Sequence, residues 1–202
     1  MKLIGLFDSP FARRVAVSMR LQGFAFEHIT LSVFRDVDEM RKINPLVKIP
    51  MLILDSGEKL IESSFILDYL DGEVAPERRL MPTSGAARTQ IQQHCAIALV
   101  AAEKSVQVMY ETKYRPAEYT YPTWAERCLT QMHDAFAMLE AQPLSPALSG
   151  TPLTQADVTT AVVFRFANFV LPEQFPQDRY PRLQQLSTHC EALPAFADTP
   201  LE

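Results

Sequence analysis

The stretch K-I-P-M-L-I-L-D-S-G-E-K-L-I-E-S, residues 48–63, decides how the N-terminal part of this chain folds. Residues 51–54 form a short apolar run that begins after a proline and ends at turn residues, which is typical of a buried strand. After the turn at residues 55–58, residues 59–61 can return as a second strand. The stretch therefore predicts a short antiparallel hairpin that ends directly before a helix.

That helix carries apolar side chains at helical spacing and is expected to stop at Gly72. Ser63 is a residue type that caps helix N-termini, and we place the cap there. A helix that begins at the end of a strand directs unpaired N–H groups toward the edge of the sheet. The sequence therefore predicts an anion site at Ser63.

The residues before this stretch complete the expected sheet. A strand, a helix, a strand and a weak helix are expected at residues 2–7, 10–22, 24–31 and 38–43. Two strands joined by a helix form a right-handed parallel unit, to which the hairpin adds an antiparallel pair. We therefore predict a four-stranded mixed sheet, covered by helices, in a domain of residues 1–76.

The second half of the chain shows helical periodicity alone. Residues 77–85 contain a proline and a glycine and are the predicted linker. An all-helical domain is expected over residues 86–202, with helices at residues 86–114, 123–141, 155 to about 171 and about 181–192. Thr154 and Asp157 have the spacing of a capping box, and the helix that they open is almost wholly apolar. That helix should therefore lie at the centre of its domain.

Composition excludes several classes of function. The 202 residues are 48% apolar with a net charge of −5 and contain no basic block, which argues against nucleic acid and against a membrane surface. No run approaches the roughly 18 apolar residues of a membrane span. The three cysteines and four histidines are scattered, without metal spacing. We expect a reduced, cytoplasmic protein without a metal, in which the cysteines serve packing.

Five motifs occur in an informative order. They are S-P-F-A-R-R-V at residues 9–15, N-P followed by K-I-P at residues 44–50, Glu62-Ser63, Thr154 with Asp157, and Y-P with L-P-A-F at residues 180–196. In this order the chain resembles the cytosolic glutathione transferases, especially serine-type, tau-like and related bacterial members. The resemblance implies an α/β thioredoxin-like N-terminal domain with a mixed four-stranded sheet, an all-α C-terminal domain, glutathione as co-substrate, and a homodimer.

The resemblance also assigns residues to the tripeptide glutathione. It implies that the bond before Pro50 is cis, so that the backbone of Ile49 can pair with the cysteinyl residue like a strand. Ser63 would offer its hydroxyl and N–H to the γ-glutamyl carboxylate, and Glu62 would attract the α-amine. Lys48 would reach the glycyl carboxylate as a point charge.

Ser9 would donate a hydrogen bond to the glutathione sulfur. A free thiol has a pKa of about 8.5, and a charge-assisted hydrogen bond of about 1.5–3 kcal/mol would lower it by roughly one to two units. The thiolate then attacks an electrophile held against the helical domain. We expect the electrophile to be a small apolar molecule that contacts Phe11, Met109, Tyr110 and Tyr114.

Each assignment has a structural alternative. Ser9 can be only a helix cap, Pro50 an ordinary trans proline, Glu62 a solvated residue before a helix, and Lys48 a surface lysine. The leading hypothesis is a glutathione transferase that conjugates small electrophiles. The alternatives are a non-catalytic binding or regulatory module of the same fold, and a glutathione-dependent peroxidase or isomerase. The presence of Ser9, Glu62 and Ser63 favours an enzyme.

Overall fold

The computed structural model describes residues 1–143, 145–176 and 178–201, which form two compact units. The first unit comprises Met1–Pro82 together with the C-terminal segment that begins at Leu193, and the second comprises Thr83–Ala192. The sequence placed residues 193–202 in the helical domain. The structure instead groups this segment with the first unit, because helix α8 (Pro194–Ala197) packs on helix α1 (Pro10–Gln22).

The first unit contains the predicted mixed sheet. Its strands are β1 (Lys2–Ile4), β2 (Glu27–Ile29), β3 (Met51–Ile53) and β4 (Lys59–Ile61), in the order β2-β1-β3-β4. β1 pairs with β2 in parallel and with β3 in antiparallel orientation, and β3 and β4 form the hairpin. The four-stranded topology is therefore confirmed, although each strand is only three residues long.

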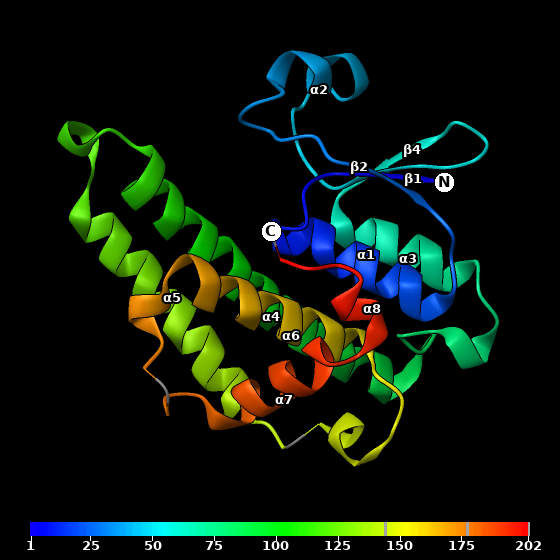
Figure 1. Ribbon diagram of the computed structural model, residues 1–202. Helices are drawn as coiled ribbons and strands as arrows, with labels where there is room; N and C mark the ends of the chain where they lie inside the picture. Colours follow the sequence, from blue (N-terminus) through cyan, green and yellow to red (C-terminus); the bar gives the residue numbers. More distant parts are fainter. Residues whose placement is uncertain (144, 177, 202) are drawn as a thin grey trace. The chain divides into compact units, whose positions relative to one another are not determined.

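Helices cover both faces of this sheet (Figure 1). α1 and α3 (Ser63–Gly72) lie on one face, where Leu3 belongs to one apolar core. α2 (Val37–Ile43) lies on the other face, where Ile4 contributes to a second core. The two adjacent residues of β1 serve opposite faces because strand side chains alternate.

The arginine at position 13 explains why the C-terminal segment joins the first unit. Arg13 is fully buried, and its Nε donates a 2.7 Å hydrogen bond to the carbonyl of Thr199. Its Nη2 lies 3.4 Å from the carbonyl of Phe196, whose ring is itself fully buried. A buried guanidinium requires such acceptors, so the segment and α1 stabilise each other.

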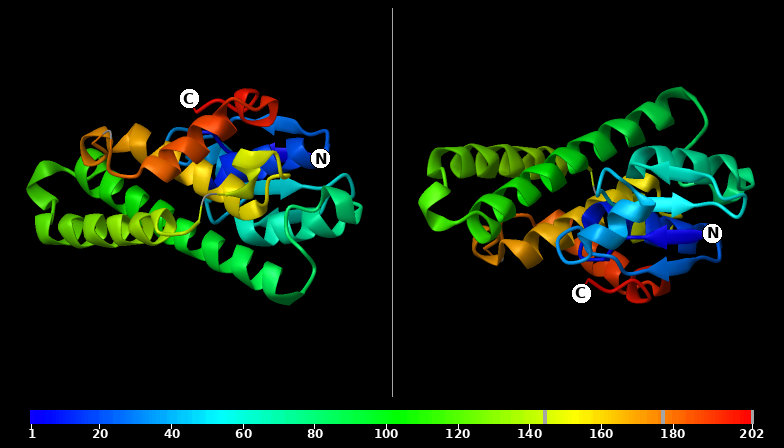
Figure 2. Two further views of the ribbon diagram at one scale, coloured as in Figure 1. Left: turned by 90° about the horizontal axis from the view of Figure 1, so that it is seen from below. Right: turned by 90° about the horizontal axis from the view of Figure 1, so that it is seen from above.

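The second unit is helical throughout its regular structure. It contains α4 (Gly85–Met109), a π-helical turn (Tyr110–Tyr114), α5 (Pro122–Glu140), α6 (Gln155–Val170) and α7 (Pro181–Glu191). Figure 2 shows α4 and α5 lying alongside each other. α6 is buried along almost its whole length, as its apolar sequence predicted.

The capping box at the start of α6 is confirmed. Asp157 N–H donates to Thr154 Oγ1 over 3.4 Å, and Thr154 N–H donates to Asp157 Oδ2 over 2.7 Å. These bonds satisfy two backbone donors that the helix end would leave unpaired. No helix in the described part of the chain combines the length and the apolar character needed to cross a membrane.

Candidate functional site

Ser9 lies between β1 and α1 and caps the helix. Its backbone is extended (φ −81°, ψ 121°), and its Oγ accepts the N–H of Ala12 over 3.4 Å. The structure therefore shows the capping role that the sequence left open as an alternative. Capping uses a lone pair of the oxygen and leaves the hydroxyl proton for another acceptor. The cap is therefore compatible with donation to a ligand.

The predicted proline turn lies beside this cap. The Ile49–Pro50 peptide bond is cis, as predicted. Gly5, at the end of β1, has a φ of +135°, and a Cβ added there would lie 3.0 Å from Ile49 Cβ and 3.2 Å from Ala12 Cβ. Ile49 therefore lies close to the first turn of α1. Among the described residues none hydrogen-bonds to the backbone of Ile49, so its N–H and C=O are available to an extended peptide.

Helix α3 begins as predicted after the hairpin, but its cap is Glu62 rather than Ser63. The backbone turns at Glu62, where φ is +70°, and the Glu62 carboxylate accepts the N–H of Ser64 over 3.1 Å. A positive φ is uncommon at glutamate, so sequence preference favours serine as the cap. Ser63 is already the first helical residue and is 1% exposed. Its N–H is one of the unpaired donors of the helix end.

Arg14 belongs to this site and was missed in the sequence. Its side chain is 2% exposed, and its Nη1 donates to Ser63 Oγ over 3.4 Å. The Ser63 hydroxyl in turn donates to Glu62 Oε1 over 3.3 Å. The guanidinium and the positive end of α3 both favour an anion next to Ser63. The sequence signal that could have identified Arg14 was its place on the buried face of α1, next to Arg13 and five residues after Ser9.

Lys48 is exposed, and its role toward a carboxylate stays a prediction. Its carbonyl accepts the side-chain amide of Asn44 over 2.8 Å, and Asn44 is 3% exposed. Asn44 therefore holds the loop that leads to the cis bond.

The residues predicted to contact an electrophile fall in different units. Phe11 is half-buried in α1, whereas Met109 ends α4 and is half-buried there. Tyr110 and Tyr114 are the first and last residues of the π-helical turn, and their side chains are 41% and 56% exposed. Their rings meet edge to face with centroids 5.6 Å apart. A shared pocket of Phe11 with the other three residues stays a prediction.

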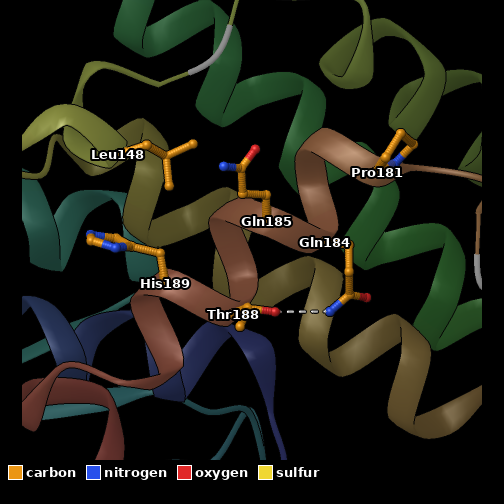
Figure 3. A pocket seen from close by; sticks show the side chains of 6 residues that line it. All are labelled: Leu148, Pro181, Gln184, Gln185, Thr188 and His189. Carbon is orange, nitrogen blue, oxygen red and sulfur yellow. Dashed lines mark hydrogen bonds between the residues drawn. The ribbon is translucent and has the colours of Figure 1, made fainter.

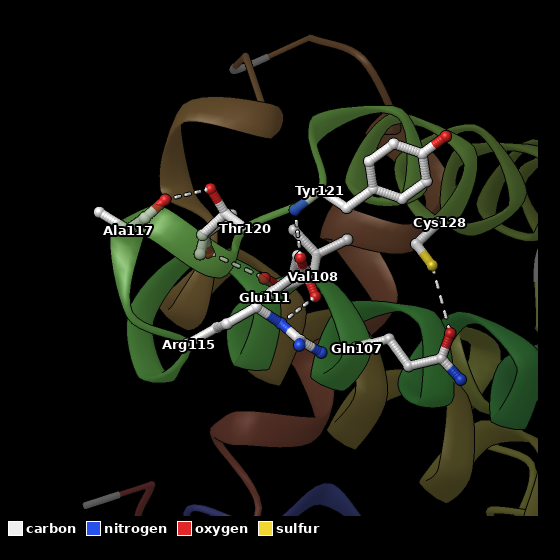
Figure 4. Close-up of polar contacts among 9 residues, drawn as sticks. Gln107, Val108, Glu111, Arg115, Ala117, Thr120, Tyr121 and Cys128 are labelled. Atoms are coloured by element: carbon white, nitrogen blue, oxygen red, sulfur yellow. Dashed lines mark hydrogen bonds and ion pairs between the residues drawn. The ribbon is translucent and has the colours of Figure 1, made fainter.

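The π-helical turn is held by a buried carboxylate (Figure 4). Glu111 is 5% exposed, and its two oxygens accept the N–H of Tyr121 over 2.6 Å and Arg115 Nε over 2.8 Å. These bonds connect the end of α4 to the start of α5. A cavity of about 370 Å³ lies beside Glu111 and includes no residue predicted for the site.

A second cavity of about 510 Å³ lies along α7 (Figure 3). It is lined by Leu148, Pro181, Gln184, Gln185, Thr188 and His189. Thr188 Oγ1 accepts the Gln184 amide over 3.1 Å, so the polar groups of this wall partly bond to each other. The cavity contains no pair of groups suited to acid–base or nucleophilic chemistry.

The cysteines serve packing, as expected. Cys95, Cys128 and Cys190 are buried thiols in the helical unit. Burial raises the pKa of Cys128, and it raises the pKa of Cys190 to about 12. Both thiols therefore stay protonated at neutral pH and are poor nucleophiles. In the described ranges, no three His, Cys, Asp or Glu side chains are grouped to hold a metal ion.

Comparison with known families and structures agrees with this geometry. The N-terminal domain of glutathione S-transferase matches residues 3–78, and the C-terminal domain matches residues 122–188. A probable maleylacetoacetate isomerase of Vibrio cholerae is 30% identical over 210 residues, covering 96% of this chain and 93% of that protein.

Solved structures are similar over nearly the whole chain. A glutathione transferase family member from Pseudomonas fluorescens Pf-5, solved with bound glutathione, is 28% identical with a TM-score of 0.88, covering 100% of this chain and 98% of that one. A glutathione S-transferase of Methylobacterium radiotolerans in complex with glutathione sulfonate is 25% identical with a TM-score of 0.86, covering 98% and 93%. The thioredoxin-like and all-helical architecture is thereby confirmed. The chain belongs to the glutathione S-transferase family.

Proposed function

We propose that this chain binds glutathione in its first unit and stabilises the thiolate for attack on a small apolar electrophile. The observation that carries the proposal is the arrangement of the end of β1, the start of α1 and the start of α3. Gly5 brings Ile49 against the turn capped by Ser9, and Arg14 connects that same helix to Ser63. Proteins of similar fold that are solved with glutathione or with glutathione sulfonate support the choice of ligand.

Each end of glutathione has a matching group in this arrangement. The γ-glutamyl carboxylate would accept the N–H of Ser63 and, in place of Glu62 Oε1, the proton of the Ser63 hydroxyl, with the guanidinium of Arg14 behind it. The exposed carboxylate of Glu62 would attract the α-amine. The backbone of Ile49 would pair with the cysteinyl residue, and Lys48 would attract the glycyl carboxylate.

The sulfur would lie at Ser9. Its hydroxyl proton, which the cap does not use, would donate to the sulfur and favour the thiolate. The thiolate would form a carbon–sulfur bond with the electrophile, and the leaving group would depart with its electron pair. Ser9 takes no proton in this step, so it acts by stabilising charge rather than as a base or nucleophile.

A homodimer is part of the proposal. Among the large apolar side chains that the first unit exposes, Phe65 at 73% and Leu46 at 62% are the most exposed. Exposed apolar side chains that form a continuous patch mark contact surfaces, and symmetric dimers are the commonest oligomers. Both groups would lose their exposure in such a contact.

Isomerisation is the second candidate, and the likeness to a probable maleylacetoacetate isomerase favours it. The same thiolate would add to a conjugated carbon–carbon double bond and send the electron pair into the adjacent carbonyl. Rotation about the resulting single bond and elimination of the thiolate would then give the other isomer. Glutathione is regenerated in this reaction, whereas conjugation consumes one glutathione for each product.

Calorimetry and two activity assays test these proposals. We expect glutathione to bind the wild type and to bind Ser63→Ala more weakly, because the anion would lose a hydroxyl donor. Turnover of a chlorodinitrobenzene with consumption of glutathione supports conjugation, and turnover of maleylacetoacetate without consumption supports isomerisation. Binding without either activity favours the non-catalytic module, and absence of binding refutes the proposed function.

A further inference from the structure

We propose that His28 is a positioning residue for the glutathione site, which holds Gly5 and thereby sets the spacing between Ser9 and Ile49. The inference deepens the proposed function and rests on it. His28 lies on the edge strand β2, opposite Leu3 of β1. Its ring lies parallel to that of Phe7, with centroids 3.8 Å apart and planes 4° apart.

The ring nitrogen of His28 makes a short contact with the backbone of Gly5. Nε2 lies 2.7 Å from the Gly5 carbonyl oxygen. A carbonyl can only accept, so Nε2 carries the proton and donates it. The N–H of Gly5 donates in turn to the carbonyl of Ile29 over 3.1 Å. Two neighbouring residues of β2 therefore hold both polar groups of Gly5.

Gly5 is a critical spacer in the proposed site. Its φ of +135° is suited to glycine, and the space where a Cβ would stand is bordered by Ile49 and Ala12. Ile49 provides the backbone that would pair with glutathione, and the N–H of Ala12 is the one that Ser9 caps. A displacement of Gly5 would therefore change the distance between Ser9 and Ile49.

This geometry predicts which property His28 controls. The γ-glutamyl end of glutathione would be held by Ser63 and Arg14, whereas the space beside Gly5 is bordered by Ile49 and Ala12. Loss of the His28 bond should therefore leave the contacts to the γ-glutamyl carboxylate in place and reduce affinity only slightly, through the shift of Ile49. It should weaken the hydrogen bond from Ser9 to the sulfur and raise the pKa of the bound thiol.

A matched pair of variants tests the role of His28. His28→Phe keeps a ring against Phe7 and removes the donor, whereas His28→Gln keeps an N–H donor and removes the ring. The thiolate absorbance of bound glutathione is titrated against pH for each variant, together with kcat, KM and thermal unfolding. For His28→Phe near pH 6.5 we expect kcat to fall by about threefold to tenfold, with KM changed by less than about twofold.

We expect the apparent thiol pKa to rise in His28→Phe and kcat to recover at high pH, with His28→Gln close to wild type. An unchanged thiol pKa in a folded His28→Phe overturns this inference and leaves the proposed function intact. A loss in His28→Gln with little loss in His28→Phe assigns His28 a packing role against Phe7 and overturns this inference. Equal loss in both variants shows that the hydrogen bond alone does not control the thiol and also overturns it. Absence of glutathione binding by the wild type overturns both proposals. If His28→Phe unfolds, His28→Asn, whose shorter side chain withdraws the amide from Gly5, replaces it in the comparison.

Discussion

At the residue scale, the candidate site consists of side chains that each satisfy the fold while leaving a group for a ligand. Ser9 caps α1 with its oxygen and keeps a proton to donate. Glu62 caps α3 with one carboxylate oxygen, while the other accepts the Ser63 hydroxyl. Substitutions at these positions therefore change stability and function together, and matched variants are needed to separate the two.

Three substitutions of Ser9 separate its cap from its proposed role. Ser9→Ala should lower stability by about 1 kcal/mol through loss of the cap, whereas Ser9→Gly should cost only a few tenths. Both variants should raise the pKa of the thiol of bound glutathione by roughly one to two units, because both remove the Ser9 hydroxyl that would donate to the sulfur. Ser9→Thr keeps the cap and the hydroxyl and serves as the control. A wild-type thiol pKa in Ser9→Gly would reduce Ser9 to a helix cap.

Arg14 should affect affinity more than turnover. Arg14→Gln removes a buried charge next to Ser63 and should raise the Kd for glutathione by roughly tenfold, with a smaller change in kcat. Arg14→Lys keeps the charge but loses the planar fork, so an intermediate Kd is expected. Calorimetry gives the Kd, and thermal unfolding shows whether each variant folds. Equal affinity in all three proteins would remove Arg14 from the site.

At the scale of single elements, helix ends were predicted well where capping residues act locally. α1 spans residues 10–22 as expected, because a proline opens it and Gly23, with a φ of +80°, ends it. α3 differs from the prediction in its cap, because the turn at Glu62 depends on a positive φ that glutamate does not signal. The strands are shorter than the apolar runs that predicted them, since neighbouring strands decide where pairing stops.

The capping box of α6 offers a test at this scale. Thr154→Ala removes the acceptor of the Asp157 N–H and should lower the free energy of unfolding by about 1 kcal/mol. Thr154→Ser keeps the hydroxyl and should stay close to wild type. Chemical denaturation measures both variants. If Thr154→Ser lowered the free energy of unfolding as much as Thr154→Ala does, the methyl group of Thr154 would matter more than the cap.

At the scale of the whole molecule, the C-terminal segment and the first unit depend on each other. Removal of residues 193–202 takes away the carbonyls that accept from Arg13 and the buried ring of Phe196. We expect the free energy of unfolding to fall by at least about 3 kcal/mol. Removal of residues 200–202 alone retains these groups and is the matched control. Equal stability of the two truncated chains would contradict this account.

Stability should also depend on pH through His133 of the helical unit. Burial lowers its pKa, and the positive charge of Arg179, whose Nη1 lies 3.2 Å from His133 Nε2, lowers it further. A lowered histidine pKa means that the unfolded chain binds more protons. The contribution of His133 to the free energy of unfolding is therefore complete above its ordinary pKa of 6.5 and is lost as the pH falls below that value.

Denaturation between about pH 7.5 and pH 5 measures this contribution. The decline in stability should be shallower in His133→Gln than in the wild type. Arg179→Gln should reduce the decline only in part, because burial, the larger cause, remains. Burial also raises the pKa of Asp71, which acts in the opposite direction but is common to all variants. An identical decline in His133→Gln would assign the dependence to other groups.

The sequence by itself determined the order and type of the elements and the motifs of the candidate site. Prolines, glycines, caps and apolar periodicity act between near neighbours, so they are readable along the chain. Only the tertiary structure decided that Arg14 and His28 contact Ser63 and Gly5, and that the C-terminal segment packs on α1. These contacts join residues far apart in sequence, and the need of a buried polar group for a partner does not reveal which partner folding supplies.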